Sequence, residues 1–304
     1  MNHPSPATRV AFLGLGIMGG GMAHRILGAG FPLTVYNRNP AKAAPLAAAG
    51  VRVADSPAAA AANADVIISM VADDAASRSL WLGESGAITA VAPGAVVIES
   101  STVTVSWVRE LAVAVAGQGG EFLDAPVTGS RVHAAAGELN FLVGGPGPTL
   151  EKVRPVLAAM SKTITSLGPV GSGALVKLIN NFVCGVQVAA IGEAIALIER
   201  GGLDRAKALE VLMNGAPGSP LVKTMAGRMT APDYTPNFHL RLMAKDLGYA
   251  LQEGAGHALR LETAAAALKV FQAGIAAGLG EQDMAAVIEP MRANAPKGQG
   301  ASNK

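Results

Sequence analysis

The sequence predicts an α/β domain built on a parallel sheet, followed by a domain made only of helices. In the first half, short β-branched runs alternate with Ala-rich helical stretches, a pattern typical of βαβ units. A glycine-rich loop directly follows the first run. After about residue 167 no further strand-like run occurs, and helical periodicity continues to about residue 291.

The chain has 304 residues, which favours two domains over one. Half of the residues are hydrophobic and 15% are charged, which excludes a disordered chain. The net charge is +2 without a dense basic cluster, so no nucleic-acid partner is expected. A single cysteine, Cys184, and the lack of zinc-type Cys/His spacing predict neither a disulfide nor a metal site. With no secretory signal recognised, a cytoplasmic location is expected.

Strands are predicted at Val10–Leu13, Leu33–Tyr36, Val66–Ser69, Val96–Glu99 and residues 141–143. Helices are predicted between them, at residues 18–27, 40–49, 57–62 and 105–116. Pro40 and Pro57 stand at first-turn positions, where a helix tolerates proline because that N–H has no helical partner.

The second half is divided into helices by Gly and Pro clusters at residues 201–202, 215–220, 232–236 and 278–280. The predicted domains are residues 1–168 and 169–293, followed by a flexible tail at residues 294–304. Residues 174–198 are apolar enough to suggest a membrane span. Polar residues such as Lys177, Asn181 and Glu193 interrupt this segment, so a long buried helix is the better interpretation.

The glycine-rich loop consists of Gly14, Leu15, Gly16, Ile17, Met18 and Gly19. It follows a predicted strand and opens a predicted helix, which is the context of a Rossmann dinucleotide-binding loop. Gly14 allows the tight turn, Gly16 lets the backbone approach a pyrophosphate, and Gly19 lets helix and strand pack closely. The sequence therefore predicts a dinucleotide whose pyrophosphate lies at the helix N-terminus.

The second strand ends in Asn37 and Arg38, where an NAD-selective protein usually has an acidic residue on the adenosine ribose. A guanidinium can bind a 2′-phosphate and stack on adenine, so NADP is favoured over NAD, which stays possible. The alternative is that Arg38, like Lys42 nearby, is simply a solvated surface residue.

Lys177 and Asn181 stand four residues apart, hence on one face of the long predicted helix. The apolar stretch that follows suggests that this face is enclosed, which would favour proton transfer by the lysine. The alternative is a lysine that extends to solvent from the start of the helix.

Two polar segments follow predicted strands, at residues 100–102 and 124–130, where open α/β sheets bind ligands. Thr128, Gly129 and Ser130 could donate hydrogen bonds to a substrate carboxylate, or could form an ordinary capped turn. His133 lies nearby, but no nucleophile motif accompanies it, and it is not expected to be catalytic.

Four segments together resemble the β-hydroxyacid dehydrogenase family, and the resemblance covers nearly the whole chain. They are residues 12–19, 124–130, 168–181 and 245–248. The resemblance implies a Rossmann domain, a long interdomain helix and an all-α C-terminal domain. It also implies that Lys177 is the catalytic lysine, that Asn181 places the substrate, and that Thr128, Gly129 and Ser130 grip the substrate carboxylate.

Thr102 and Lys245 would then contact the cofactor, and Met70 and Val71, after the third predicted strand, are also assigned to the cofactor site. One departure concerns the substrate loop. The family usually has Ser-Gly-Gly where this chain has Thr128, Gly129 and Ser130, so the identity of the substrate stays open.

The function implied is hydride transfer between NADP(H) and a small carboxylate-bearing aldehyde, keto acid or hydroxyacid. The high apolar fraction and the long predicted helices also favour a homodimer or homotetramer, because exposed apolar helix faces tend to be buried between subunits. The favoured candidate substrates are glyoxylate, succinic semialdehyde and tartronate semialdehyde, and oxidation of 3-hydroxyisobutyrate is the next candidate reaction. An imine reductase is one alternative, although Lys177 argues against it. A non-catalytic NADP-binding module is another, and the chain is too short for a 6-phosphogluconate-type dehydrogenase.

Overall fold

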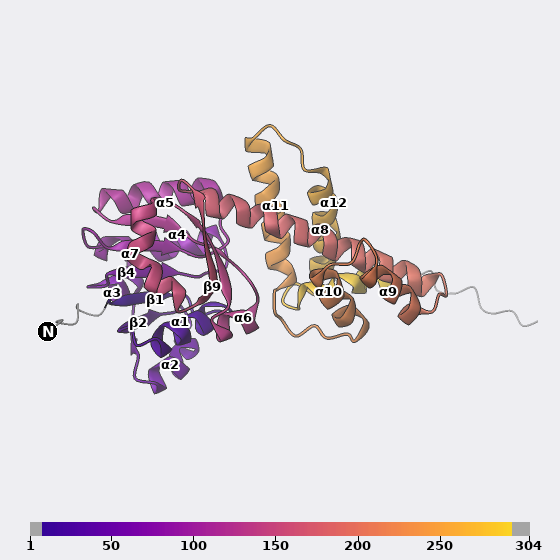
Figure 1. Cartoon of the computed structure of the whole chain (residues 1–304), viewed down its shortest axis with the longest axis horizontal. Helices are drawn as coiled ribbons and strands as arrows, with labels where there is room; N and C mark the ends of the chain where they lie inside the picture. Colours follow the sequence, from indigo (N-terminus) through magenta and orange to yellow (C-terminus); the bar gives the residue numbers. More distant parts are fainter. Residues whose placement is uncertain (1–7, 294–304) are drawn as a thin grey trace, which may run out of the picture. The chain divides into compact units, whose positions relative to one another are not determined.

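The computed structural model describes residues 8–293, and the predicted flexible tail at 294–304 lies outside the described residues. The chain forms two compact units, Met1–Lys177 and Leu178–Lys304. The first unit holds the sheet and its helices, and the described part of the second is helical (Figure 1). The division falls inside helix α8 (Ser172–Arg200), which begins in one unit and ends in the other.

Within residues 8–293, nine strands form one sheet in the first unit. In spatial order they are β3 (Arg52–Val53), β2 (Leu33–Tyr36), β1 (Val10–Leu13), β4 (Val66–Ser69), β5 (Val96–Glu99), β6 (Glu121–Asp124), β8 (Leu139–Gly144) and β7 (Val127–Thr128), with β9 (Ser161–Gly168) paired to β8. The six strands from β3 to β6 are parallel, whereas β8 is antiparallel to both β6 and β7. The predicted parallel sheet is thus confirmed for six strands and wrong for the β6–β8–β7 edge.

The strand order turns back on itself between β1 and β4, because β2 and β3 extend one way and β5 and β6 the other. Such a switch point leaves a crevice beyond the carboxyl ends of the strands, where open α/β sheets bind their ligands. β1, β4 and β5 are buried along their whole length, as expected for central strands covered on both faces.

Helices connect the strands of the first unit. They are α1 (Gly19–Gly28), α2 (Ala44–Ala48), α3 (Pro57–Ala61), α4 (Asp74–Leu82), α5 (Val105–Gly117), α6 (Arg131–Ala136) and α7 (Gly147–Ala158), with 3-10 turns η1 (Pro40–Ala43) and η2 (Ala87–Ala90). Asn39 and Ser56 cap η1 and α3, and Pro40 and Pro57 follow as first residues, as predicted. The single helix predicted at 40–49 is instead η1 followed by α2.

The described part of the second unit is all-helical, which confirms the prediction. After α8 come α9 (Arg205–Asn214), α10 (Pro220–Thr230), α11 (Leu240–Gly256), α12 (Glu262–Ala276), η3 (Met284–Ile288) and α13 (Glu289–Ala293). Each predicted break separates two of these elements. The break between α11 and α12 was not predicted, because Ala258, and not a glycine, takes the positive φ of 55° there.

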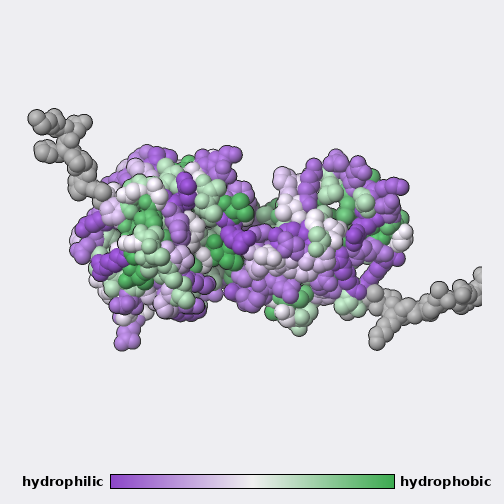
Figure 2. Space-filling view, turned by 90° about the horizontal axis from the view of Figure 1, so that it is seen from below, coloured by the Kyte–Doolittle hydropathy of each residue, from purple (hydrophilic) through white to green (hydrophobic). Residues whose placement is uncertain are grey.

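Helix α8 is long and apolar enough to cross a membrane by length and composition, with a mean hydropathy of 1.7 over its most apolar window. Half of that window is buried within the structure, and Val188 and Ile195 are fully buried in the helical core of the second unit. A core helix explains these features without a bilayer. On the face shown in Figure 2, hydrophobic and hydrophilic residues are interspersed over both units.

Candidate active site

The glycine loop is packed backbone against backbone at the switch point. Gly14 has a φ of +102°, and a Cβ added there would lie 2.3 Å from the carbonyl oxygen of Met70. A Cβ at Gly19 would lie 2.0 Å from the carbonyl oxygen of Gly14. At Gly16, in contrast, an added Cβ would meet nothing within 4 Å. Gly14 and Gly19 are therefore required by the fold, whereas Gly16 borders open space.

Asn37, at the end of β2, holds this loop in place. Its Oδ1 accepts a 2.8 Å hydrogen bond from the amide of Leu15, and its Nδ2 donates to the carbonyl of Asn39. Arg38 is exposed beside it. The structure thus places Asn37 and Arg38 beside the glycine loop, and the side-chain amide of Asn37 holds the loop through its hydrogen bond with Leu15.

The loops after β4 and β5 lie at the same edge of the sheet. The amide of Met70 donates to the carbonyl of Leu13, and the amide of Val71 donates to Oγ of Ser101 at 2.8 Å. Met70, Val71 and Thr102 are all half-buried. Three loops that carry predicted cofactor residues are therefore tied to one another at the carboxyl ends of β1, β4 and β5.

Thr128 ends β7 in a row of polar side chains that crosses three strands. Asn140 of β8 donates from Nδ2 to Oγ1 of Thr128 at 3.3 Å, and its Oδ1 accepts a 2.7 Å bond from the hydroxyl of Thr163 on β9. The register places Asn140 opposite both threonines. Because Thr128 accepts from Asn140, its own proton can point elsewhere. The sequence reasoning missed Asn140, since nothing in the strand pattern marked it.

Ser130 is the N-cap of α6, and His133 forms a capping box with it. The amide of Ser130 donates to Nδ1 of His133 at 3.1 Å, and the Ser130 hydroxyl lies 2.9 Å from the same nitrogen. This contact gives the exposed His133 ring a local structural role. Gly129, between Thr128 and Ser130, has a φ of +119°.

The first turn of α8 is fixed by Asp124, the last residue of β6. Its carboxylate is fully buried and accepts from the amides of Gly171 at 2.7 Å and Ala174 at 2.8 Å. Burial raises the pKa of Asp124, and hydrogen bonds from backbone amides act in the opposite direction. A Cβ at Gly173 would lie 2.1 Å from the carbonyl oxygen of Leu142, so the helix start lies directly on the sheet.

Lys177 and Asn181 are one turn apart on α8, with Lys177 half-buried and Asn181 buried. In the second unit, Nδ2 of Asn181 donates to Oδ2 of Asp246 at 2.6 Å. Nζ of Lys245 lies 3.0 Å from Oδ1 of Asp246 and 4.9 Å from the ring centroid of Tyr249. The structure therefore joins the predicted residues Asn181 and Lys245 through Asp246, which sequence reasoning treated as an ordinary helix charge.

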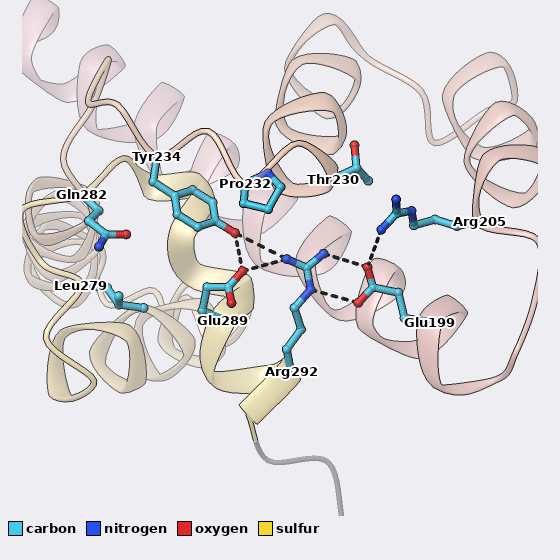
Figure 3. A pocket seen from close by; sticks show the side chains of 9 residues that line it. All are labelled: Glu199, Arg205, Thr230, Pro232, Tyr234, Leu279, Gln282, Glu289 and Arg292. Carbon is cyan, nitrogen blue, oxygen red and sulfur yellow. Dashed lines mark hydrogen bonds and ion pairs between the residues drawn. The ribbon is translucent and has the colours of Figure 1, made fainter.

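An open pocket of about 630 Å³ in the second unit contains none of the predicted site residues (Figure 3). Arg292 lies at its centre, bonded to Glu199 at 2.7 and 2.9 Å and to Glu289 at 2.7 Å. Its guanidinium lowers the pKa of Glu199, while burial and Glu289 raise the pKa of Tyr234. The charged groups pair with one another and hold α13 in place. Within residues 8–293, no His, Cys, Asp or Glu cluster is placed to hold a metal ion.

A doubly wound sheet with a glycine loop at its switch point is the architecture of a dinucleotide-binding domain, and a helical second unit follows it in this chain. Residues 9–168 match the NAD binding domain of 6-phosphogluconate dehydrogenase. Residues 171–291 match the model described as NAD-binding of NADP-dependent 3-hydroxyisobutyrate dehydrogenase. The chain belongs to the β-hydroxyacid dehydrogenase family, and is an NAD(P)-dependent oxidoreductase acting on CH–OH groups.

Two relatives illustrate this membership. Glyoxylate/succinic semialdehyde reductase 1 of Arabidopsis thaliana is 35% identical, over 93% of this chain and 98% of its own. The solved structure of Mycobacterium tuberculosis 3-hydroxyisobutyrate dehydrogenase with L-serine has a TM-score of 0.85 and 34% identity, covering 94% of this chain and 100% of the other. An imine reductase from Pseudomonas sp. is only 23% identical at a TM-score of 0.62, so it shares the fold alone.

Proposed function

We propose that this protein interconverts a small carboxylate-bearing aldehyde or keto acid and its hydroxyacid, with NADP(H) and with Lys177 as general acid and base. The observation that carries the proposal is the pair of hydrogen bonds from the start of α8 to the carboxylate of Asp124. It holds the turn that leads to Lys177 at the carboxyl end of β6, which is the same edge of the sheet as the glycine loop. Family membership supplies the reaction class.

The residues present fit a dinucleotide. Gly16 leaves the space that a pyrophosphate needs, and among residues 8–293 no side chain caps the start of α1, so its first amides can bind an anion. Arg38 would hold the 2′-phosphate, and the loops at Met70–Val71 and Thr102 would border the nicotinamide half. Lys245, on α11, is a further proposed cofactor contact. When bound, the nicotinamide supplies or accepts the hydride.

Lys177 would transfer the proton to or from the substrate oxygen. In reduction its Nζ donates a proton to the developing alkoxide, and in oxidation it accepts that proton from the hydroxyl. A cationic ammonium beside the oxygen also stabilises its negative charge. Asn181, with its amide held by Asp246, would orient the reacting group.

The substrate carboxylate would be bound by Thr128, Gly129 and Ser130. Asn140 donates to Thr128, which leaves the Thr128 proton available for an anion. The relatives' names support glyoxylate and succinic semialdehyde first, with 3-hydroxyisobutyrate as a further candidate. Tartronate semialdehyde has the same combination of carboxylate and aldehyde.

We expect K177A to lower kcat for the aldehyde by about 10³-fold, because the general acid is lost. NADPH affinity should stay within about twofold, since the glycine loop is untouched. K162A, at an exposed lysine of β9, is the matched control. Steady-state kinetics and NADPH titration measure both quantities. Normal turnover by K177A would remove the lysine from the mechanism, and turnover of cyclic imines alone by the wild type would favour an imine reductase.

R38A should weaken NADPH binding by about tenfold or more and leave NADH binding unchanged, because only NADPH carries the 2′-phosphate. R52A removes another exposed arginine from the neighbouring strand β3 and should change neither affinity. Titrations with both cofactors provide the comparison. Equal effects of R38A on the two cofactors would contradict the assigned contact.

N140D should raise the KM for the carboxylate substrate by about tenfold, with little change in the KM for NADPH. An aspartate would accept the Thr128 proton and repel the substrate anion. N214D adds the same charge at an exposed position at the end of α9 and serves as the control. An unchanged substrate KM in N140D would argue against Thr128 as the carboxylate ligand.

A homodimer or homotetramer is part of the proposal. Large apolar side chains are exposed on α8, with Ile179 at 46%, Val183 at 42% and Leu197 at 72% of their full area. Apolar area of this kind is commonly covered in an assembly. Sedimentation velocity at micromolar concentration should show two or four times the 30.6 kDa chain mass, and a monomer would be the contrary result.

A further inference from the structure

Glu99 is a buried acidic side chain that the proposed mechanism does not use. It ends β5, and none of its surface is exposed to solvent. Its Oε2 accepts from the hydroxyl of Ser77 at 2.5 Å and from Nε1 of Trp81 at 3.2 Å. Trp107 donates from Nε1 to Oγ of Ser77 at 2.8 Å, which extends the network to α5.

The other oxygen of Glu99 faces the loop after its own strand. Oε1 accepts a 2.9 Å hydrogen bond from the amide of Ser101, and Oγ of Ser101 accepts a 2.8 Å bond from the amide of Val71. A chain of hydrogen bonds therefore runs from a carboxylate in the interior to the loop after β4. That loop lies against the glycine loop, where even a Cβ at Gly14 would lie 2.3 Å from Met70 O.

A buried carboxylate has to be compensated by hydrogen bonds, so its place here needs a reason beyond packing. Val96, Val97 and Ile98, the other residues of β5, fill the core with apolar atoms alone. Glu99 differs because it binds a main-chain amide of the loop that borders the switch point. Charge-assisted hydrogen bonds of this kind restrict geometry more strongly than neutral ones.

We propose that Glu99 is a positioning residue for cofactor binding, acting through Ser101 to hold the Met70–Val71 loop in its binding conformation. The inference rests on the proposed dinucleotide site, and adds to it a residue that does not itself contact the cofactor. Because this loop is separated from β2 by β1, the effect of Glu99 on affinity is the same for NADPH and NADH, unlike that of Arg38.

The test uses E99Q and S101A, which break the same chain at two points, and the double variant. In E99Q an amide N–H faces donor groups, whereas S101A removes only the acceptor of the Val71 amide. E151Q is the control, because Glu151 forms an exposed ion pair with Arg154 within α7 and takes no part in this chain of bonds. The protein's two tryptophans, Trp81 and Trp107, both lie in the network, so intrinsic fluorescence reports its state.

We expect the Kd for NADPH and that for NADH to rise about tenfold in E99Q and in S101A, with E151Q like the wild type. The Kd of the double variant should be at most about twice that of the single variant that binds more weakly, because both substitutions act through one chain of hydrogen bonds. In E99Q the tryptophan emission should also shift. Thermal unfolding shows whether each variant is folded. If E99Q does not fold, the cofactor affinities of S101A provide the test.

Unchanged affinities in folded E99Q and S101A, independent effects that multiply in the double variant, or an effect on NADPH alone would each overturn the role of Glu99. A wild-type protein that binds neither cofactor would instead refute the proposed function. The two failures are therefore distinguishable in the same titration.

Discussion

The close approach of backbone to backbone at the switch point is the constraint on which the rest of the site depends. The backbone of Gly14 lies against that of Met70, and the backbone of Gly19 lies against that of Gly14, so neither glycine could carry a side chain. Asn37 then fixes the amide of Leu15 from the other side. A ligand at this edge meets a surface whose shape is set before it arrives, which lowers the entropy that binding has to overcome.

Around this edge, polar side chains at the ends of apolar strands do the positioning. Asp124, Glu99 and Asn140 are each placed by a strand of the sheet, and each is hydrogen-bonded to a neighbouring segment. In the second unit, Asp246 does the same for Asn181 from another helix. The groups proposed to act on the substrate and cofactor are thus held by a second set of polar residues, which restricts where they point.

The sequence predicted the parts of the fold that depend on local pattern. β1, β2, β4 and β5 have the predicted ends, because apolar runs bounded by Gly, Pro or polar residues mark buried strands. β3 and β7 are two residues long and give no periodic signal, and the exposed β9 lacks an apolar run. Asp246, which accepts from Asn181, is 65 residues away from it, and Asp124, which accepts from Gly171, is 47 residues away, so these pairings depend on the tertiary fold.

The bonds of Asp124 also bear on how the chain folds during synthesis. Its amide partners, Gly171 and Ala174, lie beyond the last strand of the sheet, in the helix that leads to the second unit. Among the described residues, a fragment that ends at residue 168 would keep every strand but lose both of those amide donors. We therefore expect the nucleotide-binding domain to reach its full stability during synthesis only after the first turn of α8 is available to fold, so that the start of α8 belongs with this domain.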